Sequence, residues 1–170
     1  MLFQGSALFD SKTVEENVRF PLDMLTKQSM EEKMERVNFC LERVGLGGKN
    51  TLMPSEISGG MQKRVGIARA IVLNSKFLFC DEPNSGLDPK TAIVIDELIH
   101  EITYEYDITT TVVTHDMNSV LGIGDKILYF QDGYKYWEGT KDDIYNVDVQ
   151  EFNDFIFANI AMHKLKESQQ

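Results

Sequence analysis

The sequence predicts an α/β fold in which a mostly parallel sheet is flanked by helices. Short apolar or β-branched runs at residues 77–80 and 109–114 alternate with stretches of helical periodicity. Acidic or histidine residues stand directly after both runs, where parallel strands bring side chains together at one edge of the sheet. We therefore expect strand–helix–strand units with polar residues at the carboxyl ends of the strands.

Residues 13–57 are predicted to form a small helical subdomain, preceded by a loop at residues 1–12 that leads out of a strand. Ser29 and Glu32 have the spacing of a capping box at a helix start, and Gly45 is placed to end that helix. An apolar stripe runs along the helix through Met34, Val37, Leu41 and Val44.

Residues 58–140 are predicted to form the core. A second helix is expected after Ser58, with one apolar face made by Met61, Val65, Ala68 and Val72. The continuous apolar run at residues 77–80 is typical of a strand buried on both faces. Asp88 and Pro89 are an N-cap and first-turn pair for a helix that ends near Tyr104.

Residues 126–130 and 134–138 flank Asp132-Gly133, which indicates a β-hairpin. Residues 141–170 are predicted to form a C-terminal helical tail. Its apolar residues at helical spacing are Phe152, Phe155, Ile156 and Ile160.

Composition argues against several kinds of protein, namely nucleic-acid-binding, membrane-spanning, disulfide-bonded and zinc-binding ones. The chain has 17 basic and 27 acidic residues, and this net charge of -10 argues against nucleic acid as the main partner. No apolar run approaches the roughly 20 residues that span a bilayer. Cys40 and Cys80 are predicted to be reduced and buried. The three histidines form no ligand spacing with cysteine or aspartate, so we expect no zinc site.

Two segments carry groups suited to phosphate and metal chemistry. Ser58, Gly59 and Gly60 are expected at the start of a helix, where glycines let phosphate oxygens approach the backbone amides. The structural alternative for these residues is a capped helix that follows a flexible turn. Asp81, at the strand end, is placed to hold Mg²⁺, and Glu82 to polarise an attacking water. An acidic turn is the structural alternative for this pair.

Two further residues have a simple structural explanation beside a functional one. Asp88 follows a serine-glycine turn and is expected to cap a helix. His115 follows the strand at residues 109–114 and is placed to donate to a γ-phosphate. A single histidine at a strand end is, however, more often an ordinary surface residue.

In this order the segments resemble the ABC ATPase family, a branch of the P-loop NTPase fold. Residues 58–60 look like the signature motif, residues 77–82 like Walker B with the catalytic glutamate, and residues 85–88 like the D-loop. His115 looks like the switch histidine. Gln4, 54 positions before Ser58, looks like the Q-loop glutamine.

The resemblance implies roles for these residues. It implies that Glu82 and His115 are catalytic and that Asp81 and Gln4 bind Mg²⁺. It also implies a set of residues that bind ATP: Gln4, Ser58, Gly59, Gly60 and Asp88.

The sequence departs from the family pattern by three substitutions and by one missing motif. Ile57 replaces the usual leucine of the signature, Met61 replaces its usual glutamine, and Asn84 stands where threonine or serine is common. A phosphate loop, Gly-x-x-x-x-Gly-Lys-Ser/Thr, is absent; around Gly48-Lys49 the first glycine position is Arg43 and the hydroxyl position is Asn50. We expect the loop and its strand upstream of Met1, which makes this a partial fold and a truncated chain.

The stretch at residues 1–18 and the Ser-Gly-Gly-Met variant resemble ATPases of bacterial Mla/Mce-type phospholipid transporters in particular. This resemblance implies a membrane permease and a second ATPase subunit as partners. It also implies a cytoplasmic protein, peripheral on the inner membrane.

Three alternatives to a transporter ATPase bear on this sequence. A DNA-repair ABC ATPase needs a long coiled coil before the signature, and the 54 positions after Gln4 leave no room for one. Translation-associated members usually carry two cassettes in one chain, which this length does not exclude for the parent protein. A non-enzymatic fragment or module that supplies only the signature side stays open.

Overall fold

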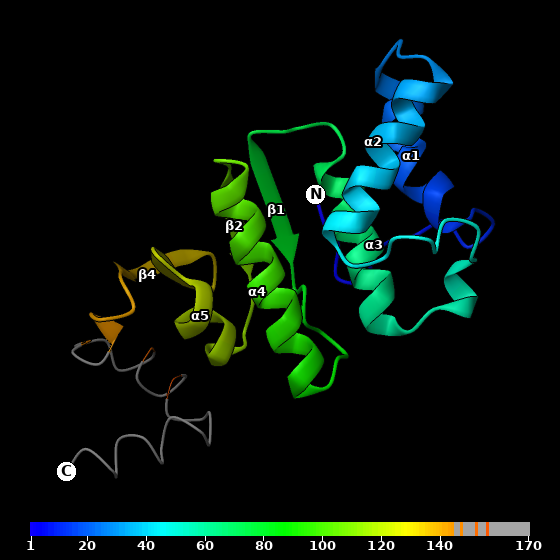
Figure 1. Cartoon of the computed structure of the whole chain (residues 1–170). Coiled ribbons are helices and arrows are strands. Elements are labelled where there is room, and N and C mark those ends of the chain that lie inside the picture. Colours follow the sequence, from blue (N-terminus) through cyan, green and yellow to red (C-terminus); the bar gives the residue numbers. More distant parts are fainter. Residues whose placement is uncertain (145–146, 148–151, 153–155, 157–170) are drawn as a thin grey trace. The chain divides into compact units, whose positions relative to one another are not determined.

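The computed structural model describes residues 1–144 together with Val147, Phe152 and Ile156. The chain divides into two units, Met1–Thr114 and His115–Gln170 (Figure 1). In the first unit, three α-helices and one 3-10 turn come before the first full strand: α1 (Val14–Leu25), α2 (Met30–Arg43), η1 (Pro54–Glu56) and α3 (Gly59–Ile71). Helices α1, α2 and α3 pack against one another.

Local sequence signals explain where these helices begin and end. Thr13 and Ser29 each form a capping box, with Glu16 and Glu32 respectively, at the starts of α1 and α2. Gly45 follows α2 with a φ of 68°, the left-handed conformation that ends many helices. The predicted capping box and helix end are therefore confirmed.

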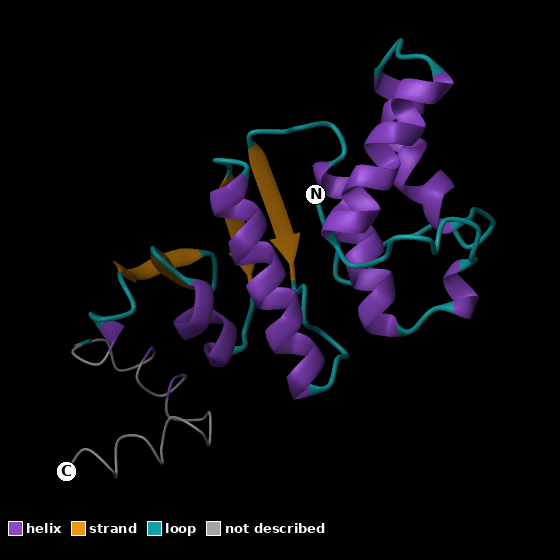
Figure 2. Cartoon of the chain, in the orientation of Figure 1, coloured by secondary structure: helices purple, strands orange, loops and turns teal. Residues whose placement is uncertain are grey.

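The sheet of the first unit is parallel. Strands β1 (Phe77–Asp81) and β2 (Thr109–Val113) pair in register from Phe77 with Thr109 to Asp81 with Val113 (Figure 2). Helix α4 (Pro89–Glu105) connects them. On the other edge of β1, Leu2 forms an isolated parallel bridge to Cys80. Three chain segments thus run in the same direction, as the strand–helix–strand pattern predicts.

One prediction about β1 is wrong, because the strand is not buried on both faces. Leu78 and Cys80 are 2% exposed, but Phe77 and Phe79 on the opposite face are 61% and 51% exposed. A continuous apolar run is expected where both faces of a strand are covered. Among the described residues, other side chains cover only the face of β1 that carries Leu78. The phenylalanine rings on the opposite face are therefore exposed to solvent.

The second unit contains helix α5 (Met117–Ile123) and the antiparallel strands β3 (Ile127–Gln131) and β4 (Tyr134–Gly139). Asp132 and Gly133 both have positive φ, 49° and 82°, as a two-residue hairpin turn requires. The predicted hairpin is confirmed. Apolar residues of the unit form one cluster: Met117, Ile127, Ile144, Val147, Phe152 and Ile156.

The predicted helical tail falls mostly on residues outside the described ones. Residues 141–143 form a turn. Phe152 and Ile156 are helical, as predicted, and both are buried, whereas Phe155 and Ile160 lie outside the described residues. The division of the chain at residues 57 and 140 stays a prediction.

Candidate functional site

The carboxyl edge of the parallel sheet brings together Gln4, Asp81 and Glu82. The Leu2 backbone N–H donates to the Phe79 carbonyl at 2.7 Å, and the Leu2 carbonyl accepts from the Asp81 N–H at 2.9 Å. This pairing fixes the start of the chain against β1. Because the paired segments are parallel, the residues that follow Leu2 and Cys80 lie at the same edge of the sheet.

Gln4 lies beside the turn that follows Glu82. Its side-chain amide nitrogen donates to the Ser85 hydroxyl at 3.3 Å. Ser85 in turn donates its backbone N–H to the Glu82 carbonyl at 3.2 Å. The glutamine predicted as a metal ligand and the serine of the predicted D-loop are thus direct neighbours.

The backbone of Glu82 adopts an unusual conformation. Its φ is 46°, in the left-handed region that residues with a side chain rarely occupy. Its N–H donates to the Val113 carbonyl in β2 at 2.8 Å, which holds the turn to the sheet. The turn directs the chain away from β1 immediately after the strand, so the side chains of Asp81 and Glu82 do not follow the simple alternation of a strand.

Lys63 of α3 links these groups, and sequence reasoning did not single it out as a site residue. It is 5% exposed, and its Nζ donates to the backbone carbonyls of Gln4 and, at 3.4 Å, Glu82. Burial lowers the pKa of Lys63, and the nearby carboxylates of Glu82 and Asp81 oppose that shift.

A sequence signal for Lys63 exists. On a helix, positions four residues apart share a face. Lys63 lies four and eight positions before Ile67 and Ile71, which are 0% and 6% exposed. A lysine in phase with buried isoleucines indicates a buried cation, and such a cation needs acceptors.

The residues predicted to form the signature motif lie at the N-terminus of α3. Ser58 is its N-cap, and the Ser58 hydroxyl accepts from the Met61 N–H at 3.3 Å. Gly59 and Gly60 are the first two residues of the helix. A side-chain carbon on Gly60 would lie 2.6 Å from Cγ2 of Thr91 in α4, so the glycine permits close packing of the two helices.

Asp88 is the N-cap of α4, as predicted. One carboxylate oxygen accepts from the N–H groups of Lys90 and Thr91, both at 3.1 Å, and the other from the Thr91 hydroxyl at 2.5 Å. These hydrogen bonds, above all those from Thr91, hold the pKa of Asp88 below its usual value. Gly60 and Asp88 therefore meet on the same side chain, that of Thr91.

His115 is the first residue of the second unit and is exposed. It follows β2 by two positions, at the carboxyl end of that strand. Its predicted role at a γ-phosphate stays a prediction.

The donor groups at the sheet edge fit a magnesium ion held partly by water. Mg²⁺ prefers oxygen ligands and usually keeps several waters, with one or two protein carboxylates and substrate phosphates completing its shell. Asp81 offers a carboxylate there, and Gln4 offers the oxygen of an amide whose nitrogen is engaged by Ser85. Among residues 1–144 and the three further described positions, no three His, Cys, Asp or Glu side chains gather to hold a metal on their own.

The N-terminus of α3 fits a phosphate group. Its helical residues begin with two glycines, so the first amides are not shielded by side chains, and the helix dipole favours an anion at this end. The helix is 13 residues long, so the peptide dipoles of several turns are aligned toward this end. Exposed Ser58 and Gly59 leave this end of α3 open to a ligand.

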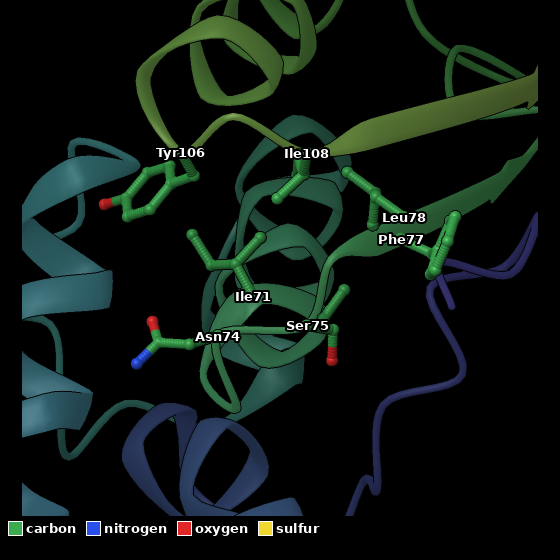
Figure 3. A pocket seen from close by; sticks show the side chains of 8 residues that line it. Ile71, Asn74, Ser75, Phe77, Leu78, Tyr106 and Ile108 are labelled. Atoms are coloured by element: carbon green, nitrogen blue, oxygen red, sulfur yellow. The ribbon is translucent and has the colours of Figure 1, made fainter.

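A hollow elsewhere on the first unit is not part of this site. Figure 3 shows its lining, which includes Ile71, Phe77, Leu78 and Tyr106. Phe77 begins β1, whereas Asp81 ends it, so the hollow lies at the opposite end of the strand. None of the predicted site residues contributes to its wall.

Both cysteines are free and buried, as predicted. Burial raises the pKa of the Cys40 thiol to about 11 and that of Cys80 to about 12, so both stay protonated at neutral pH. In the described part of the chain, no helix has the length and apolar character to cross a bilayer.

Comparison with known proteins gives relatives for this arrangement. A family described as "ABC transporter" matches residues 1–85, half of the chain. A "Methionine import ATP-binding protein MetN" of Campylobacter jejuni is 40% identical over 98% of this chain and 56% of its own length. A "Probable ribonucleotide transport ATP-binding protein mkl" of Mycobacterium leprae is 43% identical over 75% of this chain and 37% of its own length.

A solved structure agrees. It is the dimeric ATP-binding cassette MJ0796 in a post-hydrolysis state bound to ADP and Pi, with a TM-score of 0.73 and 35% sequence identity. The match covers 82% of this chain and 61% of that cassette. The chain thus spans about half of the length of the relatives that it matches, from 37% to 61% in these three.

Proposed function

The chain belongs to the ABC transporter family, and on this premise we propose that it supplies the signature, Walker B and Q-loop parts of an ATP-hydrolysing transporter subunit. The observation that carries the proposal is the meeting of Gln4, Asp81 and Glu82 at one edge of a parallel sheet, beside the buried Lys63. ATP hydrolysis by a subunit of this family would also need a phosphate loop, which these 170 residues do not contain.

In this proposal Asp81 and Gln4 hold Mg²⁺, which when bound neutralises charge on the β- and γ-phosphates of ATP. Glu82 accepts charge from the water that attacks the γ-phosphate, as a general base does. Asp81 is the last residue of β1 whereas Glu82 begins a turn with left-handed backbone, and this difference in backbone conformation supports two different roles for the adjacent carboxylates. His115 is proposed to donate a hydrogen bond to the γ-phosphate.

The signature residues are proposed to act on ATP held by a second subunit. Ser58, Gly59 and Gly60 present amides and a hydroxyl at the start of α3, and MJ0796, a relative, forms a dimer. Asp88, hydrogen-bonded to Thr91, shapes the D-loop next to the signature glycines. Two subunits would thus enclose two ATP molecules between them.

We further propose a membrane permease as the other partner, with the subunit peripheral on the cytoplasmic face of the membrane. The resemblance at residues 1–18 favours phospholipid as the cargo, whereas two relatives are named for methionine import and ribonucleotide transport. An experiment can distinguish the three candidate cargoes, which are phospholipid, methionine and ribonucleotide. In proteoliposomes, ATP hydrolysis by the permease-bound subunit should be stimulated by the true cargo and not by the other two.

A second function has one observation in its favour. The 170 residues contain no Gly-x-x-x-x-Gly-Lys-Ser/Thr, so the chain by itself lacks the lysine and amides that grip the β- and γ-phosphates. Acting alone, it would be a module that supplies only the signature side of a nucleotide sandwich.

Two measurements test the proposed function. Purified complete subunit should hydrolyse Mg-ATP, and the absence of hydrolysis in every permease and nucleotide condition would overturn the proposal. Calorimetric titration of the 170-residue chain with Mg-ATP should give no micromolar site. Micromolar binding would show instead that this chain holds the phosphates by itself.

A further inference from the structure

Three residues whose backbone carbonyls accept hydrogen bonds from side chains of α3 adopt left-handed backbone. They are Ser6, Ala7 and Glu82, with φ of 60°, 45° and 46°. Such conformations cost free energy for any residue with a Cβ and persist where the surroundings hold them in place. Two of them lie in the loop that follows Gln4, and the third is the proposed catalytic carboxylate.

Cations of α3 donate to the carbonyl oxygen of each of these residues. Arg69 donates to Ser6 and, at 2.8 Å, to Ala7. Lys63 donates to Glu82 at 3.4 Å and also to Gln4. Hydrogen bonds from charged donors are about twice as strong as neutral ones. The bonds to Ser6, Gln4 and Glu82 are also partly buried, which limits their replacement by water.

The packing of α3 against the first loop supports the same arrangement. Gly66 lies between Lys63 and Arg69, and a side-chain carbon there would lie 2.7 Å from Cδ1 of Leu2 and 3.4 Å from Cβ of Ser6. The glycine lets the loop approach the helix closely enough for both cations to reach its carbonyls. Leu2 is itself paired with β1, so the loop is fixed at both the sheet and the helix.

We propose that Lys63 is a positioning residue: it fixes the backbone of Glu82 and of Gln4 to the helix whose first turn carries the signature. This inference rests on the proposed function, because it assigns Lys63 to the geometry of the same hydrolytic site. One ammonium group bound to both carbonyls holds the carboxylate that activates water and the amide that binds the metal in a single arrangement. In this role Lys63 acts through the backbone of Gln4 and Glu82 and not on the reacting atoms themselves.

The test compares three variants of the complete subunit. Lys63→Met keeps most of the side-chain volume but removes both hydrogen bonds. Lys63→Arg keeps a cation that can donate to the two carbonyls. Arg64→Met is the matched control, since Arg64 is the next residue and donates to a carbonyl elsewhere, that of Val44 at 3.2 Å.

We expect Lys63→Met to lower kcat about 10- to 100-fold with KM for ATP within about twofold, because small misplacement of a reacting group costs this much in rate. Lys63→Arg should recover the larger part of kcat. Arg64→Met should leave kcat per folded molecule unchanged. Wild-type kcat in Lys63→Met, a loss equal to that in Arg64→Met, or no recovery with arginine would overturn the inference.

A second readout uses the 170-residue chain and does not depend on catalysis. The amides of Glu82 and Ser85 are hydrogen-bonded to Val113 and Glu82 carbonyls at 2.8 and 3.2 Å. In Lys63→Met their hydrogen exchange should speed up roughly tenfold more than in Arg64→Met, and Lys63→Arg should restore it. Unchanged exchange at both amides would overturn the positioning role even if the subunit is active. The two proposals can also fail separately. If exchange is faster in Lys63→Met but the complete wild-type subunit does not hydrolyse ATP, Lys63 still fixes the backbone of Gln4 and Glu82, and the proposed function is overturned.

Discussion

Gly60 and Thr91 pack so closely that a side-chain carbon on Gly60 would lie 2.6 Å from Cγ2 of Thr91. Real carbon atoms do not approach to this distance without a clash. Thr91 is also held in place, since its hydroxyl donates to Asp88 at 2.5 Å. Any rotation that made room would break that hydrogen bond, so the contact couples the signature helix to the cap of α4.

Gly60→Ala should therefore destabilise the chain by about 1–3 kcal/mol, the usual cost of overpacking. Gly59→Ala is the control, because its new carbon would stand 3.8 Å from Cδ2 of Leu87, an ordinary contact. Thermal unfolding should show a lower Tm only for Gly60→Ala. Adding Thr91→Ser, which removes Cγ2 but keeps the hydroxyl, should restore most of the loss; an unchanged Tm in Gly60→Ala would contradict the packing argument.

Asp88→Asn tests the electrostatic part of the same cap. The pKa of Asp88 is lowered from its usual 3.8, chiefly by the Thr91 hydrogen bonds. A carboxyl with a lowered folded-state pKa contributes stability that is fully present above its unfolded pKa and is lost as pH falls through its folded pKa. Wild type should lose more stability than Asp88→Asn below pH 3.8, whereas both should be similar at pH 7 because an amide oxygen also caps a helix.

Unfolding midpoints of the two proteins, measured from pH 7 to below pH 3.8, check this prediction. Equal losses on acidification would mean that the Asp88 hydrogen bonds do not favour the ionised form.

The exposed face of β1 should make the 170-residue chain self-associate. Phe77 and Phe79 are 61% and 51% exposed on it, and neighbouring Val113 is 60% exposed. Open apolar sheet surface favours association between copies. Phe79→Thr should reduce the association measured by sedimentation velocity with little change in the free energy of unfolding.

Leu78→Ala is the matched control on the covered face. Leu78 is 2% exposed, and its truncation should cost about 2–5 kcal/mol without reducing association. A wild-type chain that sediments as a monomer at high concentration would show that the face does not associate.

The features that could be predicted from the sequence are those determined by residues close together in the chain. The capping box at Ser29, the hairpin turn at Asp132-Gly133 and the Asp88 N-cap each depend on neighbouring residues, and all three are present. Burial of Phe77 was predicted wrongly, because it depends on which segments cover the sheet and not on the apolar run itself. Lys63 was not singled out because its acceptors, Gln4 and Glu82, lie 59 positions before and 19 positions after it.

The central claim is that Glu82 polarises the attacking water, and two substitutions in the complete subunit test it most directly. Glu82→Gln keeps the size and one acceptor but removes the charge, so kcat for ATP hydrolysis should fall by about 10²–10⁴ while ATP still binds and holds two subunits together. Asp81→Asn should instead weaken the Mg-ATP complex itself. Turnover and ATP-dependent dimerisation are measured for both variants: loss of turnover with a persistent dimer in Glu82→Gln is the predicted result, and turnover near the wild-type rate in that variant would contradict the account.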